Sequence, residues 1–150
     1  DAEEIARLLD KIKVKIADAK VAEISLDTRF DIAYEALLQI GLAALRYHNL
    51  RPNSRGGHYV TALQTLPLTI GYPKQKIRHL EEFIKQRAAG LYDGSFTPSE
   101  KELTGLIDEV CALQLQLEFC SRCLQPGLQS GSDLANWLIS KGKFSKYGLF

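Results

Sequence analysis

Apolar residues recur every three or four positions along most of the chain, which is the spacing of amphipathic helices and not of strands. In the first segment this stripe runs from Ile5 to Ala19. Acidic residues, Glu3 and Glu4 among them, precede the stripe, where the positive end of a helix dipole favours negative charge. The pattern therefore predicts a first helix over this segment.

A second helix is predicted from near Asp27 to near His48, with Ser25 or Asp27 as its N-cap. Apolar residues occupy nearly all of its circumference, which is typical of a central, buried helix. Gly41 lies inside it and costs roughly 1 kcal/mol relative to Ala unless close packing offsets that cost. We therefore expect another element to pack closely against this glycine.

Shorter helices are predicted in the middle of the chain. One runs from His58 to about Leu66, where Pro67 kinks or ends it. Another runs from Ile77 to Leu91, where the apolar spacing of three and four residues resumes.

A further helix begins after Phe96. Thr97 is predicted as its N-cap, Pro98 as its first helical residue and Glu100 as the partner of the cap three residues later. Its apolar seam alternates spacings of three and four until Pro126 and Gly127 end it. The seam favours packing inside its own bundle, and a dimer interface is the alternative. Its members are Leu103, Leu106, Val110, Leu113, Leu117, Cys120 and Leu124.

Together these helices predict an all-α fold, an antiparallel bundle of four to five helices over residues 1–129. Residues 130–150 are expected to form a short C-terminal extension, docked on the bundle or loose.

Composition places the chain among ordinary globular proteins. Hydrophobic residues make up 45% and charged residues 25%, which excludes a disordered tail, a collagen-like fibre and a disulfide miniprotein. Nineteen Lys and Arg against eighteen Asp and Glu leave a net charge of +1, which argues against a strongly basic nucleic-acid binder. Because the chain begins at Asp1 and contains no Met, we expect the native N-terminus to be missing or trimmed.

The sequence contains no signal peptide and no apolar run near the roughly 20 residues that span a bilayer, so no membrane association is expected. Three cysteines without scaffold spacing favour a reducing cytoplasm. Cys120 and Cys123 form a C-x-x-C pair, but no further set of zinc ligands accompanies them, so Cys120 is expected to act as a small buried hydrophobe. No metal and no cofactor are predicted.

The chemical outlier is the segment 46–58, which holds three Arg, two His and no carboxylate. It contains a glycine-rich loop that leads into a predicted helix, a setting in which exposed backbone N–H groups suit a phosphate. The alternative is an ordinary polar loop in which His58 caps a helix or packs. The residues predicted to bind phosphate or nucleotide are Arg46, His48, Asn53, Ser54, Arg55, Gly56 and Gly57.

Residues 25–125, and most specifically residues 33–38, 46–52 and 57–59, resemble the HEPN superfamily (higher eukaryotes and prokaryotes nucleotide-binding domain). Many members carry an Arg, four to six residues and then a His, and here six residues separate Arg51 from His58. In nuclease members this pair implies metal-independent RNA cleavage at a site shared by a homodimer. His58 would then transfer protons and Arg51 would stabilise the phosphate. This chain departs from the active members at Pro52, where they place a polar residue, and Arg55 is a second candidate phosphate ligand.

Three hypotheses follow. The first is a cytoplasmic, homodimeric HEPN-type regulatory or toxin–antitoxin-like protein that acts with nucleotide, RNA or a nucleotidyltransferase partner. The second is a metal-independent endoribonuclease with Arg51 and His58 as catalytic residues, assisted by Arg55 and Asn53. The third is a helical bundle without a ligand. Whether the chain is an enzyme stays open at this point.

Overall fold

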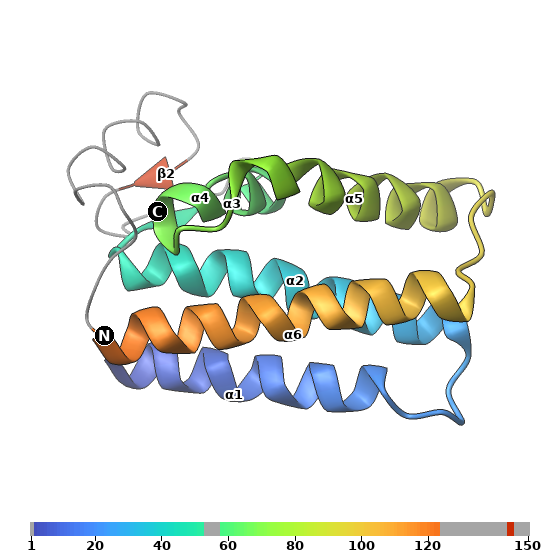
Figure 1. Cartoon of the computed structure of the whole chain (residues 1–150), viewed down its shortest axis with the longest axis horizontal. Coiled ribbons are helices and arrows are strands. Elements are labelled where there is room, and N and C mark those ends of the chain that lie inside the picture. Colours follow the sequence, from blue (N-terminus) through green and yellow to red (C-terminus); the bar gives the residue numbers. More distant parts are fainter. Residues whose placement is uncertain (1, 53–57, 124–143, 146–150) are drawn as a thin grey trace.

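The structure, a computed structural model, describes residues 2–52, 58–123 and 144–145 (Figure 1). Four long helices lie side by side along the long axis of the molecule. They are α1 (Ala2–Ala19), α2 (Leu26–Tyr47), α5 (Ile77–Tyr92) and α6 (Glu100–Cys123). Short elements connect α2 to α5, namely β1 (Arg51–Pro52), α3 (His58–Gln64), α4 (Leu66–Thr69) and the 3-10 helix η1 (Lys74–Lys76). The all-α prediction is therefore confirmed for the described part of the chain.

Helix α2 is the central element, as its apolar circumference predicts. It contacts α1, α3, α4, α5 and α6, and it begins at the predicted cap, where the Ser25 hydroxyl accepts the Thr28 backbone N–H at 3.3 Å. A Cβ on Gly41 would lie 3.2 Å from Leu63 Cδ2 and 3.3 Å from Ala62 Cβ. The missing side chain lets α3 approach α2 closely, which explains the glycine inside a helix.

The seam of α6 packs inside the bundle, as expected. Leu103 and Val110 are 1% exposed, and the three leucines that continue the seam, Leu106, Leu113 and Leu117, are fully buried. Cys120 is partly buried against the same core. Its Sγ also lies 3.8 Å from Ile70 O, so the interpretation of this cysteine as a small buried hydrophobe stays a prediction.

The predicted start of α6 is wrong by two residues. Ser99, and not Thr97, is the residue at the cap: its hydroxyl accepts the Glu102 backbone N–H at 3.2 Å, and its own N–H donates to Glu102 Oε2 at 2.7 Å. The helix begins at Glu100, so Pro98 lies outside it. The segment contains two overlapping patterns with Glu three residues after Ser or Thr, and only the second forms the reciprocal pair of hydrogen bonds.

Pro67 lies at the start of α4, shortly after the end of α3. Helix α3 ends at Gln64, and Pro67 lies in the first turn of α4, where a missing N–H costs nothing. The buried Thr65 between the two helices donates its hydroxyl to Ala62 O at 2.7 Å. The single predicted helix is thus two short ones.

A two-residue pairing was not predicted. Arg51 and Pro52 in β1 pair antiparallel with Ser145 and Phe144 in β2 (Phe144–Ser145). Two residues are too few for an alternating pattern to show in the sequence. The predicted boundary at residues 129 and 130 lies outside the described residues.

No helix in the described part of the chain is both long enough and apolar enough to cross a membrane.

Candidate functional site

The turn that follows α2 positions Arg51, one residue of the candidate site. Asn49 adopts a left-handed backbone with φ of 60°, a conformation that Asn tolerates better than most residues. Its N–H donates to Arg46 O at 2.9 Å, and the N–H of Leu50 donates to Leu45 O at 3.0 Å. These two bonds form a Schellman motif, and its apolar pair, Leu45 and Leu50, is fully buried. The motif reverses the chain and sets Arg51 beside the last turn of α2.

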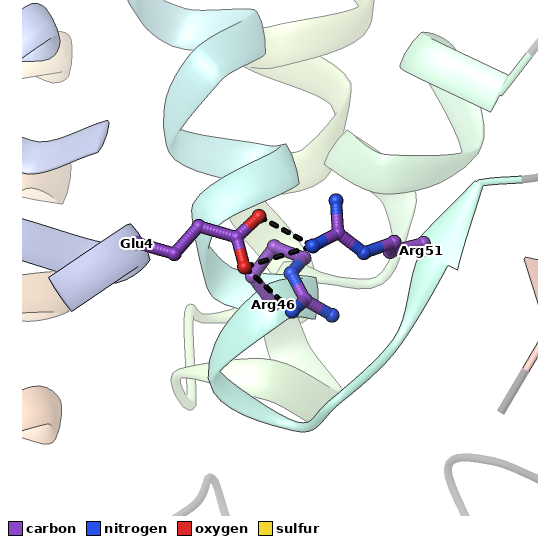
Figure 2. A network of polar contacts seen from close by, with 3 residues as sticks. All are labelled: Glu4, Arg46 and Arg51. Carbon is purple, nitrogen blue, oxygen red and sulfur yellow. Dashed lines mark hydrogen bonds and ion pairs between the residues drawn. The ribbon is translucent and has the colours of Figure 1, made fainter. Parts of the chain in front are cut away.

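Arg46 and Arg51 converge on one carboxylate that comes from the first helix, 42 residues before Arg46 (Figure 2). Glu4 lies in the first turn of α1. Its Oε2 accepts from Arg46 Nη2 at 2.7 Å and from Arg51 Nη2 at 2.8 Å, and its Oε1 lies 2.7 Å from Arg51 Nη2. Segment 46–58 contains no carboxylate of its own, but the fold brings the Glu4 carboxylate against two of its arginines.

Sequence reasoning missed Glu4, although a signal existed. Glu4 begins α1 and Arg46 ends α2, so an antiparallel pairing of these helices places the two side chains at the same end of the bundle. The Lys15–Glu35 ion pair, 2.5 Å long, shows that α1 and α2 do run antiparallel. Its members lie 11 residues from Glu4 and from Arg46, on the same two helices.

The three side chains carry two positive charges and one negative charge. Hydrogen bonding from Arg46 is the main cause that lowers the pKa of Glu4, and the positive charges of both arginines act in the same direction against the opposing effect of burial. The side chains of Arg46 and Glu4 are 13% and 20% exposed, whereas that of Arg51 is 42% exposed. Arg51 is therefore the charged group that a solute meets first.

Neither guanidinium presents its two-nitrogen edge to Glu4, because the contacts of each with the carboxylate run through a single Nη2 atom. The Nε of Arg46 is buried and has no hydrogen-bond partner among the described residues. A guanidinium can donate five hydrogen bonds, and its fork matches phosphate geometry. The cluster thus keeps donors that Glu4 does not use.

His48, the second predicted ligand in this turn, packs inward. Its Nε2 lies 2.9 Å from Thr69 O, and since a carbonyl only accepts, the ring proton sits on Nε2. Burial lowers the pKa of His48, so the ring is neutral at pH 7. The neighbouring Tyr47 hydroxyl donates to Cys120 O at 2.8 Å. These contacts join the end of α2 to α4 and α6, and His48 adds no charge to the cluster.

The other predicted ligands, namely Asn53, Ser54, Arg55, Gly56 and Gly57, lie outside the described residues. His58 is the first residue of α3, but its side chain also lies outside what the structure describes. The Arg51–His58 catalytic pair therefore stays a prediction. Within the described ranges, no three His, Cys, Asp or Glu side chains gather as metal ligands do.

The lowered pKa of Glu4 makes stability depend on pH in a defined direction. Because the folded pKa lies below the unfolded one, the contribution of Glu4 is present above the unfolded value and is lost as pH falls through the folded value. Urea unfolding between pH 7 and pH 2.5 should show a larger loss of unfolding free energy for the wild type than for Glu4→Gln, with the two curves converging at low pH.

The matched control for this measurement is Glu3→Gln, because the Glu3 side chain is 90% exposed and only 3.8 Å from Arg7 in a surface pair. It should keep the wild-type pH profile. Parallel profiles for the wild type and Glu4→Gln over the whole range would contradict the assigned role of Glu4.

Comparison with known proteins adds no relative. No family model matches the chain, and neither a curated protein nor a solved structure matches it. The function proposed below therefore depends on the geometry of the cluster and on the sequence resemblance described above.

Proposed function

We propose that this chain binds the phosphate group of a nucleotide or of RNA through Arg46 and Arg51, with Glu4 as an internal counter-ion. The observation that supports this most is the contact pattern: Glu4 engages only Nη2 of the exposed Arg51, so the other N–H groups of this guanidinium remain as donors for an oxyanion. Because the Arg51 side chain is 42% exposed, a phosphate can reach it from solvent.

Glu4 has a physical role in the ligand-free protein. Two guanidinium groups held close together repel each other, and the repulsion is strong where the groups are partly buried. A shared carboxylate compensates for this repulsion while leaving one positive charge in excess. A phosphate brings up to two negative charges and three acceptor oxygens, so it can replace the contacts that Glu4 makes on the exposed side of the cluster.

The wider role that we propose follows the sequence resemblance. The chain would act as a HEPN-type, homodimeric regulatory or toxin–antitoxin-like protein, with RNA, a nucleotide or a nucleotidyltransferase as its partner. Phosphate binding by the arginine pair is the part of this role that can be tested directly on the isolated chain.

The test is binding of a labelled single-stranded RNA, followed by fluorescence anisotropy in EDTA at several salt concentrations. Arg51→Ala should weaken binding about fivefold and reduce the slope of log K against log salt by about 0.7, the value for one phosphate contact on a single strand. Arg51→Lys should keep the slope and lose part of the affinity, because it keeps the charge but not the fork.

Lys101→Ala is the matched control. Lys101 is an exposed cation in the first turn of α6, and α6 begins at the opposite end of the bundle from the start of α1 (Figure 1). Equal effects of Arg51→Ala and Lys101→Ala would overturn the proposal. The same RNA in EDTA, incubated with the wild type, Arg51→Ala and His58→Ala, tests the ribonuclease alternative, which requires cleavage that is lost in both variants.

A further inference from the structure

A second site candidate lies beside α2, where a cavity of about 440 Å³ opens between α2, α3 and α5. This volume falls in the range of small-molecule pockets. The residues that line it and that matter here are Tyr34, Glu35, Leu38 and Gln39 from α2, Tyr59 from α3 and Arg87 from α5.

The charges at this cavity are already compensated. Arg87 Nε lies 2.9 Å from Asp31 Oδ1, and Glu35 Oε2 lies 2.5 Å from Lys15 Nζ. A charged ligand group would have to compete with one of these ion pairs. The cavity therefore suits an uncharged group.

The walls also favour a planar group. Burial raises the pKa of Tyr34, so its hydroxyl stays protonated at every physiological pH. Tyr59 is 46% exposed. Two aromatic rings and a leucine on one small cavity present surfaces on which a flat heteroaromatic ring can pack.

Gln39 is the residue of this cavity that can select a ligand by its hydrogen-bonding groups. Its Oε1 is buried and has no hydrogen-bond partner in the part of the chain that the structure describes, which costs folding free energy. The terminal torsion of Gln is broad, so the amide can turn toward the cavity that its side chain lines. A ligand that presents an N–H donor there would satisfy the oxygen and relieve this cost.

We propose that the cavity binds the adenine base of a nucleoside, a nucleotide or an RNA strand, with the exocyclic amine donating to Gln39 Oε1. The Gln amide matches the amine and the adjacent ring nitrogen of adenine as donor and acceptor. Uracil has no exocyclic amine and presents carbonyl oxygens instead. An uncharged, amine-bearing ring thus fits the compensated charges, the aromatic walls and the unpaired acceptor together.

The cavity and the arginine cluster share one helix face. Gln39, Leu42 and Arg46 are spaced three and four residues apart, so they follow one stripe of α2. Seven residues correspond to about 10 Å along the helix axis. A base in the cavity would direct its phosphate toward Arg46 and Arg51, and this step alone depends on the function proposed above.

The test is calorimetric titration of the full chain with adenosine and with purine riboside, which differs only by the missing amine. Adenosine should bind about tenfold more tightly to the wild type. Gln39→Leu should remove that difference, whereas Gln75→Leu, at an exposed position in η1, should keep it. Leu38→Trp, which fills the cavity, should abolish binding of both nucleosides. Thermal unfolding of each variant establishes that it is folded.

Oligoadenylate shows whether the base belongs to RNA or to a free nucleoside. Adenosine monophosphate tests the arginine cluster separately from the cavity. If the base belongs to RNA, oligoadenylate rather than free adenosine will show the dependence on Gln39, with oligouridylate as the negative control. Adenosine monophosphate should lose affinity in Arg51→Ala while adenosine does not. Failure of this last result alone counts against the arginine site. Equal affinities for adenosine and purine riboside with no preference for oligoadenylate over oligouridylate, or a preference that persists in Gln39→Leu, overturn the proposal for the cavity.

Discussion

Replacing Glu4 with Gln is expected to tighten phosphate binding about tenfold while it destabilises the protein. The carboxylate is the counter-ion of both guanidinium groups, so its neutralisation raises the charge of the cluster from one to two. A phosphate then competes with a neutral amide and no longer with a carboxylate. Tenfold in affinity corresponds to about 1.4 kcal/mol, which is close to the lower end of the range for one hydrogen bond to a charged group.

The same substitution should lower the unfolding free energy by about 1–2 kcal/mol, because a neutral amide cannot satisfy two part-buried guanidinium groups equally. The measurement is urea unfolding of the wild type and Glu4→Gln with and without saturating phosphate. Phosphate should restore more stability to the variant than to the wild type, since at a given phosphate concentration c the stabilisation RT ln(1 + c/Kd) increases as Kd falls.

Glu3→Gln, one residue earlier and at the surface, provides the control with the same chemical change. It should alter neither quantity. If Glu4→Gln loses stability but binds phosphate no better than the wild type, the cluster is a link between α1 and α2 and not a ligand site. The opposite signs of the two effects are what distinguish a counter-ion from a structural ion pair.

The helices could be predicted from the sequence because their apolar faces determine them. Helix α2 was expected from near Asp27 to near His48, and it spans Leu26–Tyr47. Its apolar circumference followed from its place among the other helices, and the close approach at Gly41 followed from the cost of an unpacked glycine. The signals for these features, an apolar periodicity and a single glycine, lie within the helix itself, so the sequence shows them directly.

The environment of the site could be predicted only in part. The arginines were visible as a local cluster, but their carboxylate partner is 42 residues from Arg46, and it joins them only through the pairing of α1 with α2. The Schellman motif was more accessible, because an Asn followed by an apolar residue after a helix is its usual signal, yet the prediction gave only a helix that ends near His48. Charge partners depend on tertiary contacts, whereas caps depend on neighbouring residues.

Phe30→Ala is expected to cause the largest loss of stability, about 3–5 kcal/mol, which is a large part of the stability of a domain. Phe30 on α2 is 2% exposed. Its ring meets the rings of Phe83 and Phe96 edge to face, with centroid distances of 6.5 and 5.3 Å. The residue thus joins α2 to α5 and to the segment that precedes α6. Thermal or urea unfolding measures the loss, and Phe119→Ala at a 65% exposed position should change stability by about 0.5 kcal/mol or less.

Phe30→Ala should also distinguish the two proposed sites, because only one of them depends on α5. The arginine cluster is built from α1 and from the end of α2 with the turn that follows it, whereas the cavity depends on Arg87 of α5. Below its unfolding midpoint, Phe30→Ala should therefore weaken adenosine binding, because α5 is less firmly held, and leave phosphate binding at Arg51 unchanged. An equal loss of both activities in a folded sample would show that the cluster and the cavity form one cooperative unit and that α5 supports both.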